Sequence, residues 1–231
     1  MIVFGQPRRH FAQCGSTNDA AREWGIDPDD PAPSGALVTS DFQTKGRGRR
    51  GRQWQAGFRQ SALMSFVYRP VLELPQVSQL GLMTALAVAD ALDAQIKWPN
   101  DILLKGHKVA GILVETAGPV VIVGVGVNVR QTRFVGLASF AYPPTSLSLA
   151  RGQATEVETV IEAVAQSLAQ WVNSWQRDGF ARIVTESQKR LAVGAAVKRG
   201  EEQGELVGLN ADGSALVRLP DGTFTAWVTV D

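Results

Sequence analysis

The most constraining feature of the chain is a basic segment, residues 45–52 (KGRGRRGR), with five cations and three glycines in eight positions. Glycine leaves the backbone mobile and able to approach a ligand closely. Arginine offers planar pairs of donors that suit carboxylate and phosphate groups. The segment is therefore typical of a mobile, cationic loop that closes over a small anion.

Two other interpretations of this segment are open, a solvated cationic turn and a nucleic-acid tether. An AT-hook would need a proline where Arg50 stands, and a P-loop would need a Gly-Lys-Ser/Thr ending. The chain has a net charge of +1, and −4 once the five cations of the segment are set aside. Because the positive charge is local, we expect no general nucleic-acid-binding face.

The length and composition bound the class of protein. A chain of 231 residues with 45% hydrophobic residues suits one sizeable domain, or one domain with a small appendage. The single cysteine, Cys14, excludes an intrachain disulfide and is typical of a reducing compartment. The start lacks an apolar signal-peptide core, and no apolar run approaches the ~20 residues that span a bilayer. We expect a cytoplasmic protein without a membrane partner.

The first 190 residues carry patterns of both strands and helices. The basic segment is a long excursion between two predicted strands, where functional loops are common. Residues 120–129 are apolar on both faces, which predicts a central strand. Thr155 and Glu158 predict a capping box. The expected elements are strands at 36–42, 61–68, 96–98, 109–115 and 120–129, helices beginning at Ser16 and Thr155, and helices at 80–92 and about 180–190.

Residues 191–231 have a different pattern, in which short strands alternate with dense turn signals. The strands are expected at 196–198, 205–209, 215–219 and 223–228. This pattern predicts a small β-barrel of about forty residues. We therefore predict two domains, residues 1–190 and 191–231.

Three further sets of polar residues could carry chemistry. Residues 16–18 (STN) combine hydroxyls and an amide with the free donors of a helix N-terminus, although plain capping is the alternative. Residues 97–101 (KWPND) place a lysine beside two polar acceptors, although a surface turn is the alternative. Lys108 precedes a strand in which Gly111 indicates close approach of a ligand, although the lysine alone could be a solubilising edge charge.

Catalytic metal and nucleophile signatures are missing from the sequence. His10 and His107 have no partner at metal-binding spacing, so we expect no transition-metal site. No Ser-His-Asp arrangement or nucleophile elbow is visible.

Taken together and in this order, the polar sets resemble the motifs of the biotin protein ligases. The resemblance covers residues 16–147 and continues more faintly to the C-terminus. It implies an α+β fold with a mixed sheet and flanking helices, like class II aminoacyl-tRNA synthetases, plus a small C-terminal SH3-like β-barrel. No room is left before Ser16 for a DNA-binding domain, so the short form is expected. The matching stretches are 16–18, Gln43 with 46–52 and Trp54, 97–101, 108–113, 124–128 and 145–147.

The resemblance implies a two-step acyl transfer. Biotin reacts with ATP to give biotinyl-5′-adenylate, and a lysine of a biotin carboxyl carrier protein then accepts the biotinyl group. Because the carboxylate and the polyphosphate repel, cations must bridge them. Mg²⁺ is expected with the nucleotide, and a homodimer would suit the family.

The family pattern also implies roles for individual residues. Aromatic and proline residues at 134–144 are expected over the adenine. The catalytic residues are expected to be Lys97, Arg49 and Lys108. The biotin-binding residues are expected to be Ser16, Thr17, Asn18, Gln43, Arg47, Gly48, Arg49, Lys108 and Gly111. The ATP-binding residues are expected to be Arg47, Arg49, Arg50, Trp54, Asn100, Asp101 and Asn128.

The nearest alternative is a lipoate or octanoyl ligase on the same scaffold. The full basic segment after Gln43 favours biotin. The chain departs from the family pattern in the acidic, proline-rich insert 27–34 and in the ending 228–231 (VTVD). These departures bear on carrier docking rather than on activation.

Overall fold

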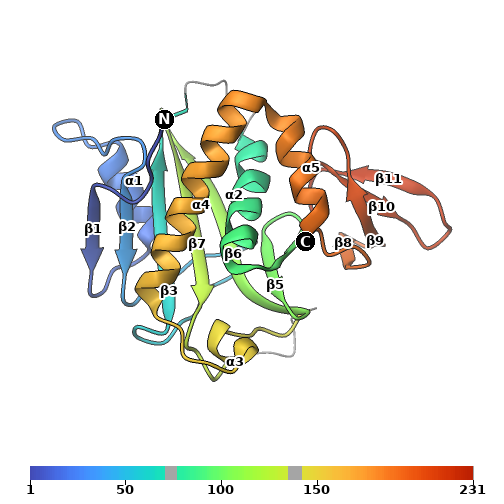
Figure 1. The fold of residues 1–231 in the computed structure, drawn as a ribbon, viewed down its shortest axis with the longest axis horizontal. Coiled ribbons are helices and arrows are strands. Elements are labelled where there is room, and N and C mark those ends of the chain that lie inside the picture. Colours follow the sequence, from blue (N-terminus) through green and yellow to red (C-terminus); the bar gives the residue numbers. More distant parts are fainter. Residues whose placement is uncertain (71–76, 135–141, 231) are drawn as a thin grey trace.

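The computed structural model describes residues 1–70, 77–134 and 142–230 of the chain. Its centre is a seven-stranded mixed sheet with the order β1-β2-β3-β7-β6-β5-β4 (Figure 1). β1 runs parallel to β2, and the other neighbours are antiparallel. The strands are β1 (Arg8–Phe11), β2 (Leu37–Ser40), β3 (Ser61–Tyr68), β4 (Gln95–Lys97), β5 (Asp101–Leu104), β6 (His107–Ala117) and β7 (Val120–Asn128).

Helices cover both faces of this sheet. α2 and α4 pack together on one face, and the shorter α1 lies on the other (Figure 1). The two faces separate by alternation, since Phe66 and Val123 join the large core while Val67 and Ile122 join the small core under α1. The helices are α1 (Thr17–Gly25), α2 (Val77–Leu92), α3 (Leu147–Arg151), α4 (Val157–Asp178) and α5 (Phe180–Arg190), with a 3₁₀ turn η1 (Arg49–Gly51).

Most of the predicted elements are confirmed. β3 has the predicted bounds, and β7 lies between β3 and β6 with both faces covered. α5 spans the predicted residues 180–190. The basic segment connects β2 to β3, which are hydrogen-bonded neighbours. The predicted excursion from the sheet is therefore confirmed.

The predicted capping box at α4 is wrong. Glu156 is the N-cap residue, without a side-chain capping bond. The carboxylate of Glu158 forms an ion pair with Arg8, and Glu156 forms one with Arg130. A long-range contact with Arg8 therefore takes the Glu158 carboxylate that local spacing assigned to the cap.

The C-terminal residues form a second sheet, and the predicted closed barrel is not confirmed. The described strands pair in the open order β11-β10-β9-β8. They are β8 (Ala196–Arg199), β9 (Glu202–Leu209), β10 (Ala215–Arg218) and β11 (Phe224–Trp227). The sheet adds to the main core, and Trp98 Nε1 donates to the Gly213 carbonyl at 3.0 Å. Side chains from both sides of the predicted boundary near residue 190 therefore pack in one hydrophobic core.

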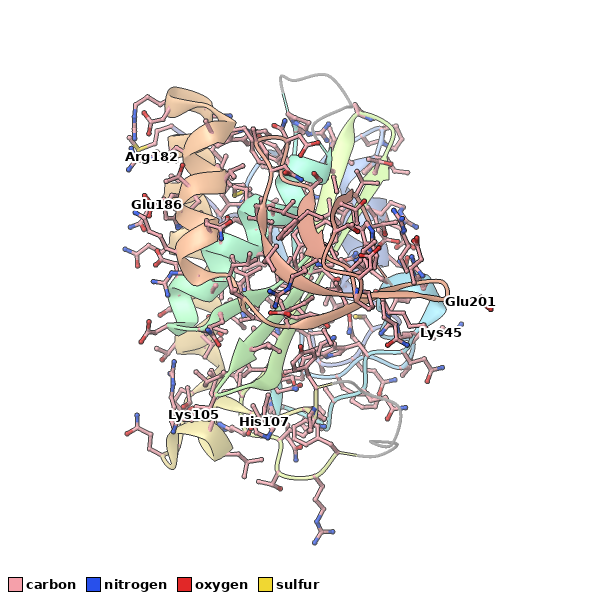
Figure 2. The ribbon with its side chains drawn as sticks, turned by 90° about the vertical axis from the view of Figure 1, so that its right-hand side faces the viewer. Lys45, Lys105, His107, Arg182, Glu186 and Glu201 are labelled. Carbon is pink, nitrogen blue, oxygen red and sulfur yellow. The ribbon has the colours of Figure 1, made fainter. Side chains whose placement is uncertain are left out.

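Figure 2 views the molecule from the end that carries this second sheet and shows charged side chains on its surface. Arg182 and Glu186 project outward from α5, and Lys105 and His107 lie at the turn between β5 and β6 (Figure 2). Among the described residues, no helix is long and apolar enough to cross a membrane.

Candidate functional site

The floor of the candidate site is part of the main sheet, on the face that carries α1 and beginning at the N-terminal end of this helix. Pairing aligns Ser65, Gly124 and Leu113 in one row across β3, β7 and β6, and Leu63, Gly126 and Gly111 in the next. These rows share the α1 side of the sheet with Val67 and Ile122 because side chains alternate along a strand. Glycines here leave room for groups above the sheet.

A neutral hydrogen-bonding network occupies one end of this floor, where α1 begins. Ser16 caps α1 by accepting from the Asn18 backbone N–H, which confirms the predicted helix start. Gln43 Oε1 accepts from the backbone N–H of Thr17 at 2.6 Å and from its hydroxyl at 3.0 Å. The Ser65 hydroxyl lies 2.8 Å from Thr17 Oγ1 and 2.5 Å from Asn18 Oδ1. The four predicted polar residues therefore lie together.

Gly124 is required where this network meets the floor. A Cβ at this position would lie 2.2 Å from Asn18 Oδ1, which is a severe clash. The sequence interpretation of Gly111 as a sign of close approach by a ligand stays a prediction, and at Gly124 the approaching group is the Asn18 amide.

The basic segment folds back on itself above the floor. Arg47 bridges to Gln53 in an isolated β-bridge, and the Gly48 N–H donates to the Arg52 carbonyl at 2.7 Å. Lys45, at the start of the segment, is exposed and projects from the edge of the molecule (Figure 2). The segment is a short hairpin-like turn with its two ends held together.

Arg47 lies at the neutral end, between two carboxylates. Its guanidinium is 2.5 Å from Asp19 Oδ2 and 3.0 Å from Glu115 Oε2. Arg22 approaches the same carboxylates, at 3.4 Å from Asp19 and 3.3 Å from Glu115. The hydrogen bond to Asp19 raises the pKa of Arg47 above its ordinary value. Two arginines and two carboxylates thus balance in charge.

Arg49 lies in a different environment. Nη1 donates to Asn100 Oδ1 at 2.8 Å, and Nη2 donates to Thr229 Oγ1 at 3.0 Å. Burial, followed by repulsion from Arg50, lowers the pKa of Arg49. Within the described residues, Arg49 forms no ion pair with a carboxylate. Its charge is held by neutral partners and remains available to an anion.

Lys97 lies at the same end, where β4 ends. Burial is the main cause that lowers the pKa of Lys97, and nearby Lys108, Arg52 and Arg49 lower it further, while Asp101 opposes them. Its ammonium lies 5.8 Å from the centre of the Tyr142 ring. The charged form of a partly buried lysine among cations is stabilised when an anion binds beside it.

Lys108 and the adjoining polar residues complete this end. Lys108 Nζ forms a 2.7 Å ion pair with Asp101 Oδ1, and both side chains are about four-fifths buried. Asn128 Nδ2 donates to the Thr145 carbonyl, while the Thr145 N–H donates to the Lys108 carbonyl. Asn128 therefore joins the site through Thr145.

Trp54 lies between the two ends and covers the glycine floor. A Cβ on Gly126 would lie 2.7 Å from the Trp54 ring, and one on Gly111 would lie 3.0 Å from it. The indole Nε1 is buried without an acceptor among the described residues. The packed ring and unpaired donor fit a residue that faces a ligand.

The structure thus brings together most of the residues predicted from the sequence. Arg50 is exposed, with a left-handed φ of 57°, and its charge acts on Arg49. Sequence reasoning gave no role to Asp19, Glu115, Ser65 and Thr229, and it expected Tyr142 only among the residues that cover the adenine. Ser65 carries a usable signal, because it is a polar residue within the fully buried strand β3. The expected adenine cover at 134–144 lies mostly outside the described residues, since 135–141 are not described.

A resident metal centre is not indicated. The described residues contain no group of three or more His, Cys, Asp or Glu side chains that could hold a metal ion. Asp101 is the carboxylate at the cationic end, and one carboxylate suits Mg²⁺ that is carried by a polyphosphate.

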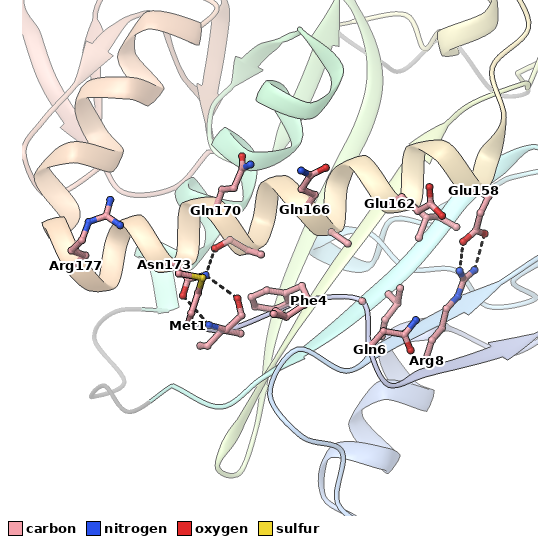
Figure 3. A pocket seen from close by; sticks show the side chains of 17 residues that line it. Met1, Phe4, Gln6, Arg8, Glu158, Glu162, Gln166, Gln170, Asn173 and Arg177 are labelled. Carbon is pink, nitrogen blue, oxygen red and sulfur yellow. Dashed lines mark hydrogen bonds and ion pairs between the residues drawn. The ribbon is translucent and has the colours of Figure 1, made fainter.

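A cavity of about 610 Å³ lies away from this site, between the N-terminal residues and α4. Asn173 exchanges two hydrogen bonds of 2.8 Å with the backbone of Ile2, and Arg8 pairs with Glu158 at the other end (Figure 3). None of the predicted site residues lines this cavity.

The geometry places a neutral hydrogen-bonding network and a group of cations at opposite ends of one glycine floor, under a basic loop, as expected of a class of protein that binds a neutral polar group and an anion together. Such a site can bring an acid and a polyphosphate together.

Comparisons with known proteins identify the family. Residues 11–131 match the model of the biotin/lipoate A/B protein ligase family. The chain is 36% identical to the biotin–[acetyl-CoA-carboxylase] ligase of Paracoccus denitrificans, over 83% of this chain and 88% of that protein. It is 31% identical to the bifunctional ligase/repressor BirA of Bacillus spizizenii, over 95% of this chain and 72% of that protein. The chain belongs to the biotin/lipoate A/B protein ligase family.

A solved structure agrees with this assignment. The biotin protein ligase from Aquifex aeolicus in complex with biotin and ATP superposes with a TM-score of 0.83. The identity is 27%, and the match covers 97% of each chain. The fold is therefore that of a biotin protein ligase.

Proposed function

We propose that the chain activates biotin with ATP to biotinyl-5′-adenylate and transfers the biotinyl group to a lysine of a biotin carboxyl carrier protein. The observation that carries the proposal is the division of one site into a neutral end and a cationic end. The first end suits the uncharged ureido ring of biotin, and the second suits its carboxylate and the phosphates of ATP. The similarity to the Paracoccus and Aquifex ligases supports the same reaction.

In the first step, a biotin carboxylate oxygen bonds to the α-phosphorus of ATP, and the bond from that phosphorus to pyrophosphate breaks. Two anions must meet, so the step needs positive charge that is already in place. Lys97, Arg49 and Lys108 supply it. Lys97 is the catalytic lysine of this proposal, because it is partly buried at the end of β4 and feels the charges of Lys108, Arg52 and Arg49.

In the second step, the amine nitrogen of the carrier lysine bonds to the biotinyl carbonyl carbon. The bond from that carbon to AMP breaks, and the nitrogen loses a proton. The adenylate is a mixed anhydride that water can hydrolyse, so the basic segment must cover it until the carrier arrives.

The remaining site residues divide between biotin and the nucleotide. Gly111 and Gly126 flank the valeryl tail of biotin beneath Trp54, which also contacts the nucleotide, while Gly48 lies in the covering segment. Mg²⁺ enters with ATP, and Asp101 and Asn100 are the residues that would hold it. The ureido ring contacts Ser16, Thr17, Asn18 and Gln43, and the nucleotide contacts Asn100, Asp101, Asn128, Arg49 and Arg50.

Further expectations belong to the same proposal. The chain has two domains, residues 1–190 and 191–231, and acts in the cytoplasm. It forms a homodimer and takes no nucleic acid as a partner. The hydrophobic core continues across residue 190, so the two domains pack against each other.

The direct test is to incubate the protein with ATP, Mg²⁺ and biotin, and to measure pyrophosphate release and biotinyl-adenylate by mass spectrometry. We expect both products with biotin and neither with lipoate. Lipoate lacks the ureido group that the neutral end would bind, so this arm also tests the alternative within the family. Absence of biotinyl-adenylate, or equal turnover of lipoate, would overturn the proposal.

A further inference from the structure

The contacts of Arg47 differ from those expected of a phosphate ligand. Its guanidinium reaches a carboxylate of α1, Asp19 at 2.5 Å, and a carboxylate of β6, Glu115 at 3.0 Å. A cation between two carboxylates has little charge left for an anionic substrate. The charge of Arg47 is instead used to join the basic segment to the body of the protein.

Glu115 connects this contact to the neutral end of the site. Asn18 Nδ2 donates to Glu115 Oε2 at 2.6 Å, and the same oxygen accepts from Arg47 Nη2. Asn18 Oδ1 in turn accepts from the Ser65 hydroxyl at 2.5 Å. One carboxylate therefore fixes both the orientation of the Asn18 amide and the position of the segment above it.

We propose that Asp19 and Glu115 are positioning residues that fasten the basic segment over the site through Arg47. This inference rests on the proposed function, in which the segment retains the adenylate and opens for the carrier lysine. Arg49 keeps the anion-binding role, since its partners Asn100 and Thr229 are neutral. The two arginines, two residues apart, thus perform different tasks.

The exposure of the three side chains suits a fastener that must open in each catalytic cycle. Arg47 is 36% exposed, Asp19 38% and Glu115 24%. Ion pairs at this exposure are screened by solvent and individually weak. Two such pairs hold the segment without preventing its release, whereas a fully buried pair would be costly to break.

The test uses Asp19→Asn and Glu115→Gln, which keep the shape of each side chain and remove its charge. We expect the amount of free biotinyl-adenylate in solution to rise about fivefold for each variant, because each loses one partly exposed contact. The single-turnover rate of adenylate formation should change less than the leak. Asp30→Asn is the matched control, because Asp30 is a distant carboxylate that pairs with Arg9 and is 84% exposed.

A double-mutant cycle separates the fastener from a general structural effect. Asp19→Asn and Arg47→Gln should be non-additive in adenylate leakage, while Asp19→Asn and Arg49→Gln should act independently. The charge swap of Asp19→Arg with Arg47→Asp should restore retention in part. Wild-type retention in both single variants, or independent effects of Asp19 and Arg47, would overturn the proposal.

Limited trypsin digestion without any ligand gives a second readout, since the segment offers several cleavage sites. We expect Asp19→Asn and Glu115→Gln to be cut within residues 45–52 several times faster than wild type and Asp30→Asn, because an unfastened loop opens more often. If the wild-type protein made no biotinyl-adenylate, the proposed function would be wrong, but trypsin digestion would still test whether Asp19 and Glu115 hold the basic segment in place. Unchanged cleavage would contradict the fastener alone.

Discussion

The two ends of the site differ in how they treat charge, although both lie under the same basic segment. At the α1 end, Arg47 and Arg22 are balanced by Asp19 and Glu115. At the β4 end, Lys97, Lys108, Arg49 and Arg52 act on one another, with Asp101 as the opposing carboxylate. Arginine therefore forms structural ion pairs at one end and is available to bind an anion at the other.

This difference teaches that the charge of a loop cannot be assigned to a ligand as a whole. Arg47 and Arg49 are equally suited to phosphate by residue type. Their neighbours determine their roles. Carboxylates neutralise the charge of Arg47, while an amide and a hydroxyl only orient Arg49. The predictions below test this contrast by altering one end at a time.

The largest effect is expected from Lys97→Ala. Removing this partly buried cation from the proposed reacting centre should slow adenylate formation about 100- to 1,000-fold. Binding of the uncharged part of biotin should change little, because that part is held at the other end. Single-turnover pyrophosphate release and titration with biotinamide measure the two quantities, and equal losses in both would contradict the division.

Arg49→Ala should release the intermediate. Activation continues because Lys97 and Lys108 remain, but free biotinyl-adenylate should accumulate in solution about tenfold above wild type. Quantifying the adenylate after rapid filtration of the protein checks this expectation. Undiminished retention would refute the role assigned to Arg49.

Gly124→Ala should damage only the neutral end. The new methyl group would meet Asn18 Oδ1 at 2.2 Å, so the amide must move out of its network. We expect KM for biotin to rise about tenfold, with KM for ATP nearly unchanged. Steady-state kinetics with each substrate varied in turn would test this, and a matching rise in KM for ATP would argue against separate ends.

The smallest effect is a shift in pH dependence. Burial and neighbouring cations lower the pKa of Lys97, so it loses its charge at a lower pH than an ordinary lysine. Activation should therefore fall on the alkaline side, at lower pH in kcat/KM than in kcat, since bound ATP favours the charged form. Lys97→Arg should move the fall to higher pH. The effect on stability runs the other way. Between the lowered pKa of Lys97 in the folded protein and its ordinary pKa in the unfolded chain, the unfolded chain binds more protons, so the free energy of unfolding rises with pH in this range.

Much of the fold could be predicted because local patterns agree with the tertiary structure. β3 and α5 were predicted with their bounds, and the end of β3 is marked locally by the Arg69-Pro70 pair that follows it. β1 was missed because its four residues, RRHF, carry no apolar pattern and gain their structure from parallel pairing with β2. Glu158 misled the interpretation of the α4 cap because its partner, Arg8, is 150 residues away.

The site shows the same limit. Motif spacing located Lys97, Asp101 and Lys108, whose side chains the structure brings to one end. It could not separate Arg47 from Arg49, because that distinction depends on where Glu115 and Thr229 lie in three dimensions. Asp19 directly follows the polar set at 16–18, and only the folded position of the basic segment reveals its partner.

The most direct test of the central claim is calorimetric titration of biotin and biotinamide, an analogue without the carboxylate, into wild type, Arg49→Gln and Glu115→Gln. The account predicts that Arg49→Gln weakens binding of biotin but not of biotinamide. It also predicts that Glu115→Gln weakens both ligands to a similar extent, because the hydrogen bond from Asn18 Nδ2 loses its charged acceptor. Equal weakening of both ligands by Arg49→Gln would contradict the division of the site into a neutral end and a cationic end.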